Sequence, residues 1–268
     1  MGKYNALIWV ILVLFSTTIL KAQDIEVAPV RINFNIAPGE SQSRTVAVKN
    51  HGNRPETITL QMQDFLIQRQ GGMERLPAGS TRNSIANWIS LSPSFVELQP
   101  NESQNIQVNL QAPSDDDVAK WGTLSFFSTS EQLAFTADRE LQTGVTVSGR
   151  IDIFLFYNPA TGEPGRVGIS NLQEVESTID NERKFTVNLD NLGNKITGCK
   201  VFLLASNLNT MEEHKFRTVE VTTYPQTSRT LELILPNTLP EGRYSLAAIL
   251  DYPGSGSLKG TQITINIE

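Results

Sequence analysis

Residues 30–36 read Val30-Arg31-Ile32-Asn33-Phe34-Asn35-Ile36, a strict alternation of apolar and polar side chains. Successive side chains of a β-strand point to opposite faces, so this pattern places one face in a core and the other in water. The same alternation returns in Thr45-Val46-Ala47-Val48, Ile106-Gln107-Val108-Asn109-Leu110 and Phe185-Thr186-Val187-Asn188-Leu189. The pattern predicts strands that belong to sheets with one buried face.

Turn-forming residues separate these stretches, as in Pro38-Gly39, Gly71-Gly72 and Pro253-Gly254. Gly and Pro end strands because they supply backbone conformations that a ladder cannot use. Only residues 83–88 and 114–120 could form a helix, and neither segment exceeds two turns. Frequent turns without a long helical period predict an all-β fold of sandwiches.

Two prolines and two glycines fall within Asn158-Pro159-Ala160-Thr161-Gly162-Glu163-Pro164-Gly165. A central strand does not continue through such a segment. We therefore predict two tandem immunoglobulin-like β-sandwich domains, over residues 23–158 and 159–268, each of ordinary domain size. In the second domain, Gly242-Arg243-Tyr244 has the pattern of a tyrosine corner, in which the hydroxyl caps a nearby backbone group.

A turn sequence occurs twice, as Pro38-Gly39-Glu40-Ser41-Gln42 and as Pro100-Asn101-Glu102-Ser103-Gln104. Each copy precedes an alternating stretch at the same spacing. The repeat predicts that the two strands that follow lie side by side in one sheet and are entered from the same end. Chance similarity between two turns is the alternative.

Residues 1–22 are predicted to be a cleavable signal peptide. Lys3 gives a positive start, residues 6–15 are an uninterrupted apolar run, and Leu20-Lys21-Ala22 suits a signal peptidase. The run is shorter than the roughly 20 residues that span a bilayer. We expect an exported chain that begins at Gln23 and is not inserted in a membrane; retention of the segment as an anchor is the alternative.

The composition argues against nucleic-acid binding. The chain has 22 Lys and Arg against 28 Asp and Glu, and loss of Lys3 and Lys21 with the leader lowers the net charge from −6 to −8. An acidic surface does not attract nucleic acid or anionic lipid. The one cysteine, Cys199, cannot form an intrachain disulfide and is expected to be a small core residue.

Residues that could perform catalysis are sparse. The two histidines, His51 and His214, lie in different predicted domains, and neither has a Cys or a carboxylate cluster at metal-ligand spacing. His51 lies in a turn with Gly and Asn, where a surface role is expected instead of a catalytic triad. Ser114-Asp115-Asp116-Asp117 lacks the Gly and the distal Glu of a calcium loop. We expect no catalytic residues, no metal and no cofactor, and the protein is not predicted to be an enzyme.

Four segments follow one another in an ordered set: residues 30–34, residues 88–100, residues 120–127 and residues 151–159, which end in Phe156-Tyr157-Asn158-Pro159. Together they resemble the N-terminal domain of the periplasmic pilus chaperones of the PapD-like superfamily, whose last strand ends in Phe-Tyr-Arg-Pro. The resemblance implies a periplasmic chaperone without a cofactor. It would bind an exported protein or a pilus-type subunit by strand addition at the groove between its domains. Neither the oligomeric state nor the client follows from the sequence.

The resemblance also implies a site for the client's C-terminal carboxylate, formed in that family by one basic residue on the first strand and another on the last strand of the first domain. Arg31 falls at the first position. Arg150 is the candidate for the second, but it lies two residues early and Asp152 occupies the matching place, where it would repel a carboxylate. A shift of two residues keeps the same strand face. Solvent-facing arginines without a client role are the alternative for both.

The last strand of the first domain is the expected donor, with four apolar client-binding side chains on one face: Val145, Val147, Ile151 and Ile153. Phe154 and Phe156 lie on the other face. A strand that is apolar on both faces is either central in a sandwich or awaiting a partner strand, and the sequence leaves both open. The rival function is a structural or adhesive tandem module that binds a cell-envelope or surface partner, on the cell surface or secreted.

Overall fold

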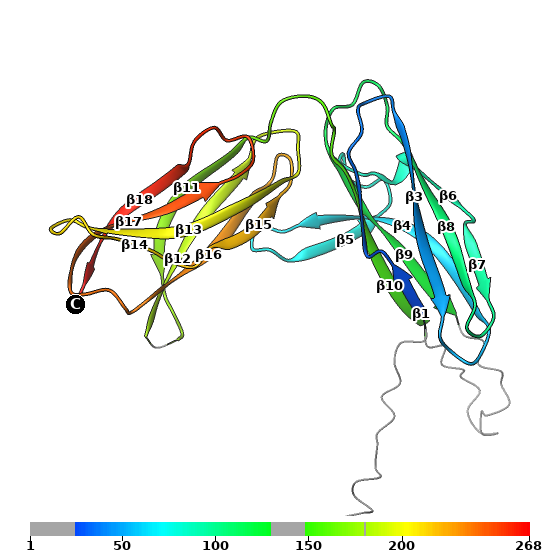
Figure 1. Cartoon of the computed structure of the whole chain (residues 1–268), viewed down its shortest axis with the longest axis horizontal. Helices are drawn as coiled ribbons and strands as arrows, with labels where there is room; N and C mark the ends of the chain where they lie inside the picture. Colours follow the sequence, from blue (N-terminus) through cyan, green and yellow to red (C-terminus); the bar gives the residue numbers. More distant parts are fainter. Residues whose placement is uncertain (1–24, 130–147, 180) are drawn as a thin grey trace, which may run out of the picture.

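The computed structural model describes residues 25–129, 148–179 and 181–268. The regular elements in these ranges are β-strands, apart from one 3-10 turn at Ala86–Trp88. Strands β1 to β10 form two sheets and strands β11 to β18 form two more, which gives two β-sandwiches in tandem (Figure 1). The predicted all-β fold is confirmed. The predicted signal peptide, Val145 and Val147 lie outside the described residues.

The first sandwich packs a four-stranded sheet against a six-stranded sheet. The four-stranded sheet has the order β1 (Ile25–Ala28), β3 (Ser41–Asn50), β8 (Ser103–Gln111) and β6 (Ile89–Ser92). The six-stranded sheet has the order β2 (Arg31–Phe34), β10 (Ser148–Tyr157), β9 (Lys120–Thr129), β4 (Glu56–Ile67) and β5 (Met73–Pro77), and β7 (Phe95–Leu98) also pairs with β4.

The second sandwich has a three-stranded and a five-stranded sheet. The smaller sheet has the order β11 (Val167–Val175), β12 (Glu182–Asn191) and β16 (Ser228–Pro236). The larger has the order β14 (Glu213–Lys215), β13 (Thr197–Asn207), β17 (Gly242–Asp251) and β18 (Lys259–Ile267), with β15 (Val219–Thr223) also paired with β13.

Each sandwich has its own apolar core, built from the inward residues of the alternating stretches. Ile32, Phe34, Val46 and Val48 are all buried in the first core, as the alternation predicts. Burying a side chain of this kind stabilises a fold by about 1.5–3 kcal/mol. The cores explain why short strands of modest propensity hold together without a disulfide.

Two predictions for the second sandwich are confirmed. Cys199 is 2% exposed and packs within the core, where burial raises the pKa of its thiol. The buried Tyr244 donates its hydroxyl to the carbonyl oxygen of Pro240 at 3.0 Å, which is the bond of a tyrosine corner.

The repeated turn gave one correct and one wrong prediction. The strands that follow the two copies, β3 and β8, do lie side by side. They are antiparallel, with Ser41 opposite Gln111 and Lys49 opposite Ser103, so they are entered from opposite ends of the sheet. A turn sequence sets where a strand begins, whereas the direction of its neighbour depends on the connections between them.

Within the ranges that the structure describes, no helix is long and apolar enough to cross a membrane.

Candidate functional site

The first strand of the chain is divided between the two sheets of the first sandwich. β1 pairs with β3 in one sheet, and after Pro29 the chain continues as β2 beside β10 in the other. β2 runs parallel to β10 and covers it only from Phe154 to Tyr157. In the described part of the chain, no strand pairs with residues 148–153 of β10 on that side. β10 is therefore a central strand in its second half and an edge strand in its first half.

The open edge presents particular backbone groups. The N–H of Phe154 donates to the carbonyl oxygen of Val30 at 2.9 Å, so the backbone of Phe154 points toward β2. Alternate residues of a strand direct their backbone groups to opposite sides, so Arg150 and Asp152 point the same way as Phe154. Ile151 and Ile153 point their backbone groups to β9. The N–H and C=O groups of Arg150 and Asp152 therefore lie along the open edge.

Apolar side chains lie at the end of this edge. Val30, immediately before β2, is 63% exposed, and Ile151 is partly buried against the first core. Ile153 is 0% exposed and belongs to that core, so its side chain is not presented to a partner, in contrast to the predicted client-facing role. Of the four predicted apolar residues, Ile151 alone is described at the margin of the edge.

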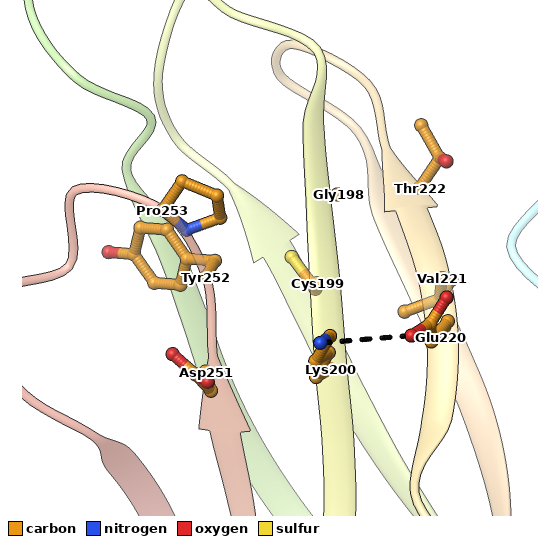
Figure 2. Close-up of a pocket in the computed structure, with 9 residues that line it drawn as sticks. All are labelled: Gly198, Cys199, Lys200, Glu220, Val221, Thr222, Asp251, Tyr252 and Pro253. Carbon is orange, nitrogen blue, oxygen red and sulfur yellow. Dashed lines mark ion pairs between the residues drawn. The ribbon is translucent and has the colours of Figure 1, made fainter.

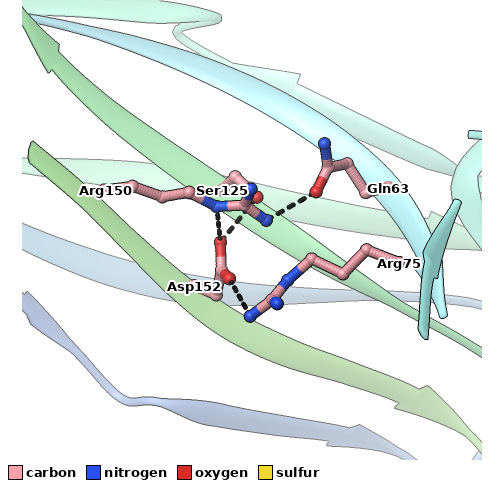
Figure 3. Close-up of polar contacts among 5 residues, drawn as sticks. All are labelled: Gln63, Arg75, Ser125, Arg150 and Asp152. Atoms are coloured by element: carbon pink, nitrogen blue, oxygen red, sulfur yellow. Dashed lines mark hydrogen bonds and ion pairs between the residues drawn. The ribbon is translucent and has the colours of Figure 1, made fainter. Parts of the chain in front are cut away.

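Arg150 and Asp152 lie together on the outer face of the sheet (Figure 3). The carboxylate of Asp152 accepts hydrogen bonds from Arg150 Nε at 2.7 Å, from Ser125 Oγ at 2.7 Å and from Arg75 Nη2 at 3.0 Å. Arg150 Nη2 also donates to Gln63 Oε1 at 2.5 Å. This ladder of contacts crosses four strands, β10, β9, β4 and β5.

These contacts determine how the charges of Asp152 and Arg150 are balanced on this face of the sheet. Burial by itself would raise the pKa of Asp152, but the hydrogen bonds from Arg150 and Ser125 outweigh it and hold the pKa below its usual range. Asp152 stays ionised and neutralises Arg150 instead of repelling a client. The Arg150 side chain is bound within the sheet and does not offer a free cation for a carboxylate.

Arg31 differs from Arg150. Its guanidinium carbon lies 4.2 Å from the centre of the Phe156 ring, and its Nε donates to Asn33 Oδ1 at 3.1 Å. The residue is exposed. Among the residues that the structure describes, no carboxylate lies within ion-pair distance of it. Arg31 therefore has no acidic partner among the described residues, and it lies where β2 begins and the open edge of β10 ends.

This chain is similar to known proteins in its structure and not in its sequence. No family model matches the chain, and no curated protein matches its sequence. The class 5 fimbrial chaperone CfaA is 13% identical, with 91% of this chain and 99% of that chain covered and a TM-score of 0.49. A chain in the Salmonella enterica complex of SafA pilin with the SafB chaperone is 12% identical, with 91% and 98% covered and a TM-score of 0.44. The chaperone DraB of E. coli is 15% identical, with 91% and 97% covered and a TM-score of 0.40. At these identities the likeness to fimbrial chaperones is one of fold.

An aromatic cluster that includes Phe156, the ring in contact with Arg31, joins the two sandwiches. Phe65, Trp121 and Phe156 of the first sandwich pack with Tyr224 of the second. The ring of Tyr224 lies 4.9 Å from Trp121 and meets Phe65 edge to face at 6.0 Å. Edge-to-face pairs add about 0.5–1.5 kcal/mol beyond the area that they bury. The second sandwich is therefore packed against the sheet that carries β10.

Polar contacts reinforce this junction. The hairpin of β4 and β5 projects toward the second sandwich (Figure 1), and the N–H of Thr230 donates to the carbonyl oxygen of Arg69 at its tip, at 2.7 Å. Arg82 Nη2 donates to Gln226 Oε1 at 2.6 Å. The sequence predicted the segment around residues 158–165 as the junction and did not predict these contacts. The sequence offers one indication of this contact surface, the apolar side chains of Phe154 and Phe156 on the same face of a strand. No sequence pattern indicates that Tyr224 belongs to it.

A hollow on the second sandwich is a poor candidate for chemistry (Figure 2). It is lined by residues of β13 and β15 and by the end of β17. Its charged pair, Lys200 and Glu220, is 3.9 Å apart, and the thiol of Cys199 is buried with a raised pKa. A buried, protonated thiol is not a nucleophile. No group of three or more His, Cys, Asp or Glu residues in the described ranges could hold a metal ion.

Proposed function

We propose that this chain is an exported chaperone-like protein that binds a β-protein client by adding a client strand to the open edge of β10. The observation that carries the proposal is that β2 covers β10 only from Phe154 onward. Among the described strands, none pairs with the backbone groups that Arg150 and Asp152 direct to that side, next to the exposed Val30. An added strand would satisfy those groups and cover the valine.

The direction of the added strand follows from the position of β2. A client strand parallel to β10 would lie in line with β2 and end where β2 begins, which brings its C-terminus to Arg31. A guanidinium binds a carboxylate through two parallel hydrogen bonds, and an unpaired one is free to do so. An antiparallel strand would bring a cationic amino terminus to the same point. We therefore propose parallel addition of a C-terminal strand, such as that of a pilus-type subunit.

The remaining parts of the proposal concern organisation and location. Residues 23–158 and 159–268 are proposed as the two domains, with the client bound beside their junction. Cleavage of residues 1–22 would deliver the chain to the periplasm, where subunits of exported assemblies require protection of their unpaired edges.

Proline substitution tests the open edge directly. Proline lacks an N–H and is tolerated on an edge strand where that N–H faces solvent. Arg150→Pro removes one N–H from the open edge without removing a backbone bond to β9. It also removes the side-chain bonds to Asp152 and Gln63, so Arg150→Ala, which keeps the N–H, is measured beside it. The client strand would lose one hydrogen bond and fit less well against the edge. Client recovery from the native envelope, measured by quantitative mass spectrometry, should therefore fall by about tenfold.

The matched control is Glu232→Pro on β16. Thr230, two residues before Glu232, points its N–H away from β12. The N–H of Glu232 therefore also lies on the free edge of β16, which belongs to the second sandwich. This variant should recover the same partners as the unmodified chain. If Arg150→Pro also recovers them in equal amounts, strand addition at β10 is wrong and the adhesive-module function replaces it. The unfolding midpoint of each variant checks that the fold is retained. A second measurement needs no substitution: the Asp152 amide should be protected from exchange in the client complex.

A further inference from the structure

The two sandwiches are built alike at one end, around a buried asparagine. In the first sandwich Asn50 ends β3, and its Nδ2 donates to the carbonyl oxygens of Arg54 at 2.7 Å and of Leu98 at 3.2 Å. Its Oδ1 accepts from the N–H of Gly52 at 2.8 Å, and its own N–H donates to the carbonyl oxygen of Glu102 at 2.9 Å. This one residue therefore joins the turn after β3 to the turn between β7 and β8.

Asn191 makes the same contacts in the second sandwich. It ends β12, and its Nδ2 donates to the carbonyl oxygens of Lys195 at 2.9 Å and of Thr223 at 3.3 Å. Its Oδ1 accepts from the N–H of Gly193 at 3.0 Å, and its own N–H donates to the carbonyl oxygen of Thr227 at 3.0 Å. The partners are equally spaced along both sequences, so the residues of these turns can be matched one to one.

The turn between β7 and β8 also matches the turn between β15 and β16 in conformation. Each contains a proline followed by a residue with a positive φ, 63° in the first turn and 55° in the second. The N–H of Glu102 donates to the carbonyl oxygen of Gln99 at 3.0 Å, and the N–H of Thr227 donates to that of Tyr224 at 3.2 Å. Gln99 and Tyr224 therefore occupy the same position in the two sandwiches.

In the second sandwich this end contacts the first sandwich. The carbonyl oxygen of Asn194 accepts from the N–H of Ala119 at 2.8 Å, and Arg82 donates to the side chain of Gln226 at 2.6 Å. Tyr224 is 9% exposed, but it does not belong to the core of its own sandwich. The rings that it contacts, at 4.9 to 6.4 Å, all belong to the first sandwich. The burial of Tyr224 therefore depends on the junction.

The same end of the first sandwich is polar. The residues that match the three contacting residues of the second sandwich are all exposed: Asn53, Gln99 and Asn101. The asparagine network and both turns thus form without an aromatic ring at this position. The ring of Tyr224 is not needed to build the end of the sandwich, and its contacts are those of an interface.

We infer that Tyr224 is the residue that positions the second sandwich beside β10. Aromatic side chains bury large apolar areas and dominate the energetics of interfaces. The hydrogen bonds at this junction contribute less, because their groups would bond to water if the sandwiches separated. The inference concerns the junction and does not depend on strand addition at β10.

The experiment replaces Tyr224 with the residue that the first sandwich has at the same position. All variants are made in the chain from Gln23 with Trp88→Phe, which leaves Trp121 as its only tryptophan. Trp121 is 2% exposed, and its ring lies 4.9 Å from that of Tyr224. Tyr224→Gln should raise the quenching of Trp121 emission by acrylamide severalfold. It should also increase the radius of gyration in solution X-ray scattering, because the sandwiches separate.

Two matched variants accompany it. Tyr224→Phe keeps the ring and should be quenched as the unmodified chain is. Gln99→Tyr makes the reverse exchange at the exposed end of the first sandwich, and it should also leave the quenching unchanged. Amide exchange within β12 and β13 should stay slow in all variants, because each sandwich keeps its own core.

Three results would overturn the inference. Unchanged quenching in Tyr224→Gln would mean that the polar contacts position the second sandwich. Fast exchange in β12 and β13 of that variant would make Tyr224 a structural residue of its own sandwich. An equal rise in quenching in Tyr224→Phe would assign the contact to the hydroxyl instead of the ring. None of these results bears on strand addition, which Arg150→Pro tests at β10.

Discussion

The guanidinium carbon of Arg31 lies 4.2 Å from the centre of the Phe156 ring, on the face of β10 that meets the second sandwich. The ring fixes the side chain beside the aromatic cluster without neutralising its charge. A cation held in this way loses little conformational freedom when it binds a ligand, which favours binding over folding as its role.

Substitution of Arg31 should therefore separate binding from stability. Arg31→Gln is expected to reduce client recovery by about tenfold, since a charge-assisted bond to a carboxylate contributes about 1.5–3 kcal/mol. The free energy of unfolding should fall by only about 0.5–1 kcal/mol, the value of an exposed cation–π contact. Urea unfolding and client recovery measure the two effects. A large loss of stability would make Arg31 a structural residue and remove it from the site.

Amide hydrogen exchange should reveal the two halves of β10. The amides of Arg150 and Asp152 face the open edge and are expected to exchange quickly in the free chain. Those of Ile151 and Ile153 face β9, and that of Phe156 faces β2, so all three should exchange slowly. Equal protection of neighbouring amides throughout the strand would show that another segment covers the edge.

The Asp152 ladder should give a stability that depends on pH. The folded pKa of Asp152 lies below its usual value, so its contribution is complete above the unfolded pKa of about 3.9 and is lost as the pH falls through the folded value. The stability difference between the unmodified chain and Asp152→Asn should thus be largest at neutral pH and shrink in acid below about pH 4. Urea unfolding at several pH values measures it. Asp251→Asn, which removes an exposed carboxylate with no ion pair among the described residues, is the matched variant measured beside it.

The tyrosine corner offers a test within the second sandwich. Tyr244→Phe removes the hydrogen bond to Pro240 and keeps the buried ring, so it should cost about 1 kcal/mol of unfolding free energy. Denaturant unfolding measures the change. Client recovery should not change, because the corner is remote from β10; a parallel loss of binding would contradict this separation.

The buried face of the alternating strands could be predicted from the sequence, but the edges of the sheets and the burial of Ile153 in β10 could not. The alternation at Ile32 and Phe34 correctly placed these residues in the core, because period two is a property of any half-buried strand. The division of the first strand between two sheets depends on contacts with β3 and β10, which lie far away in the sequence. The same limit applies to Arg150 and Asp152, which also bind Gln63 and Ser125 on neighbouring strands. Tyr224 follows a strand of ordinary pattern, so only the packed structure shows that it contacts Trp121.

The β4–β5 hairpin extends from the first sandwich and contacts the second sandwich at its tip. Its tip is closed by the bond from Gln68 N–H to the Gly72 carbonyl oxygen, and Gly71 adopts a positive φ of 96° that other residues rarely take. Since each strand residue adds about 3.4 Å, one extra residue in each arm would move the tip by that distance. To keep the bond from Thr230 N–H to the Arg69 carbonyl oxygen, the second sandwich would have to move with the tip. Hairpin length is thus one of the features, together with the aromatic cluster around Tyr224, on which the position of the second sandwich beside β10 depends.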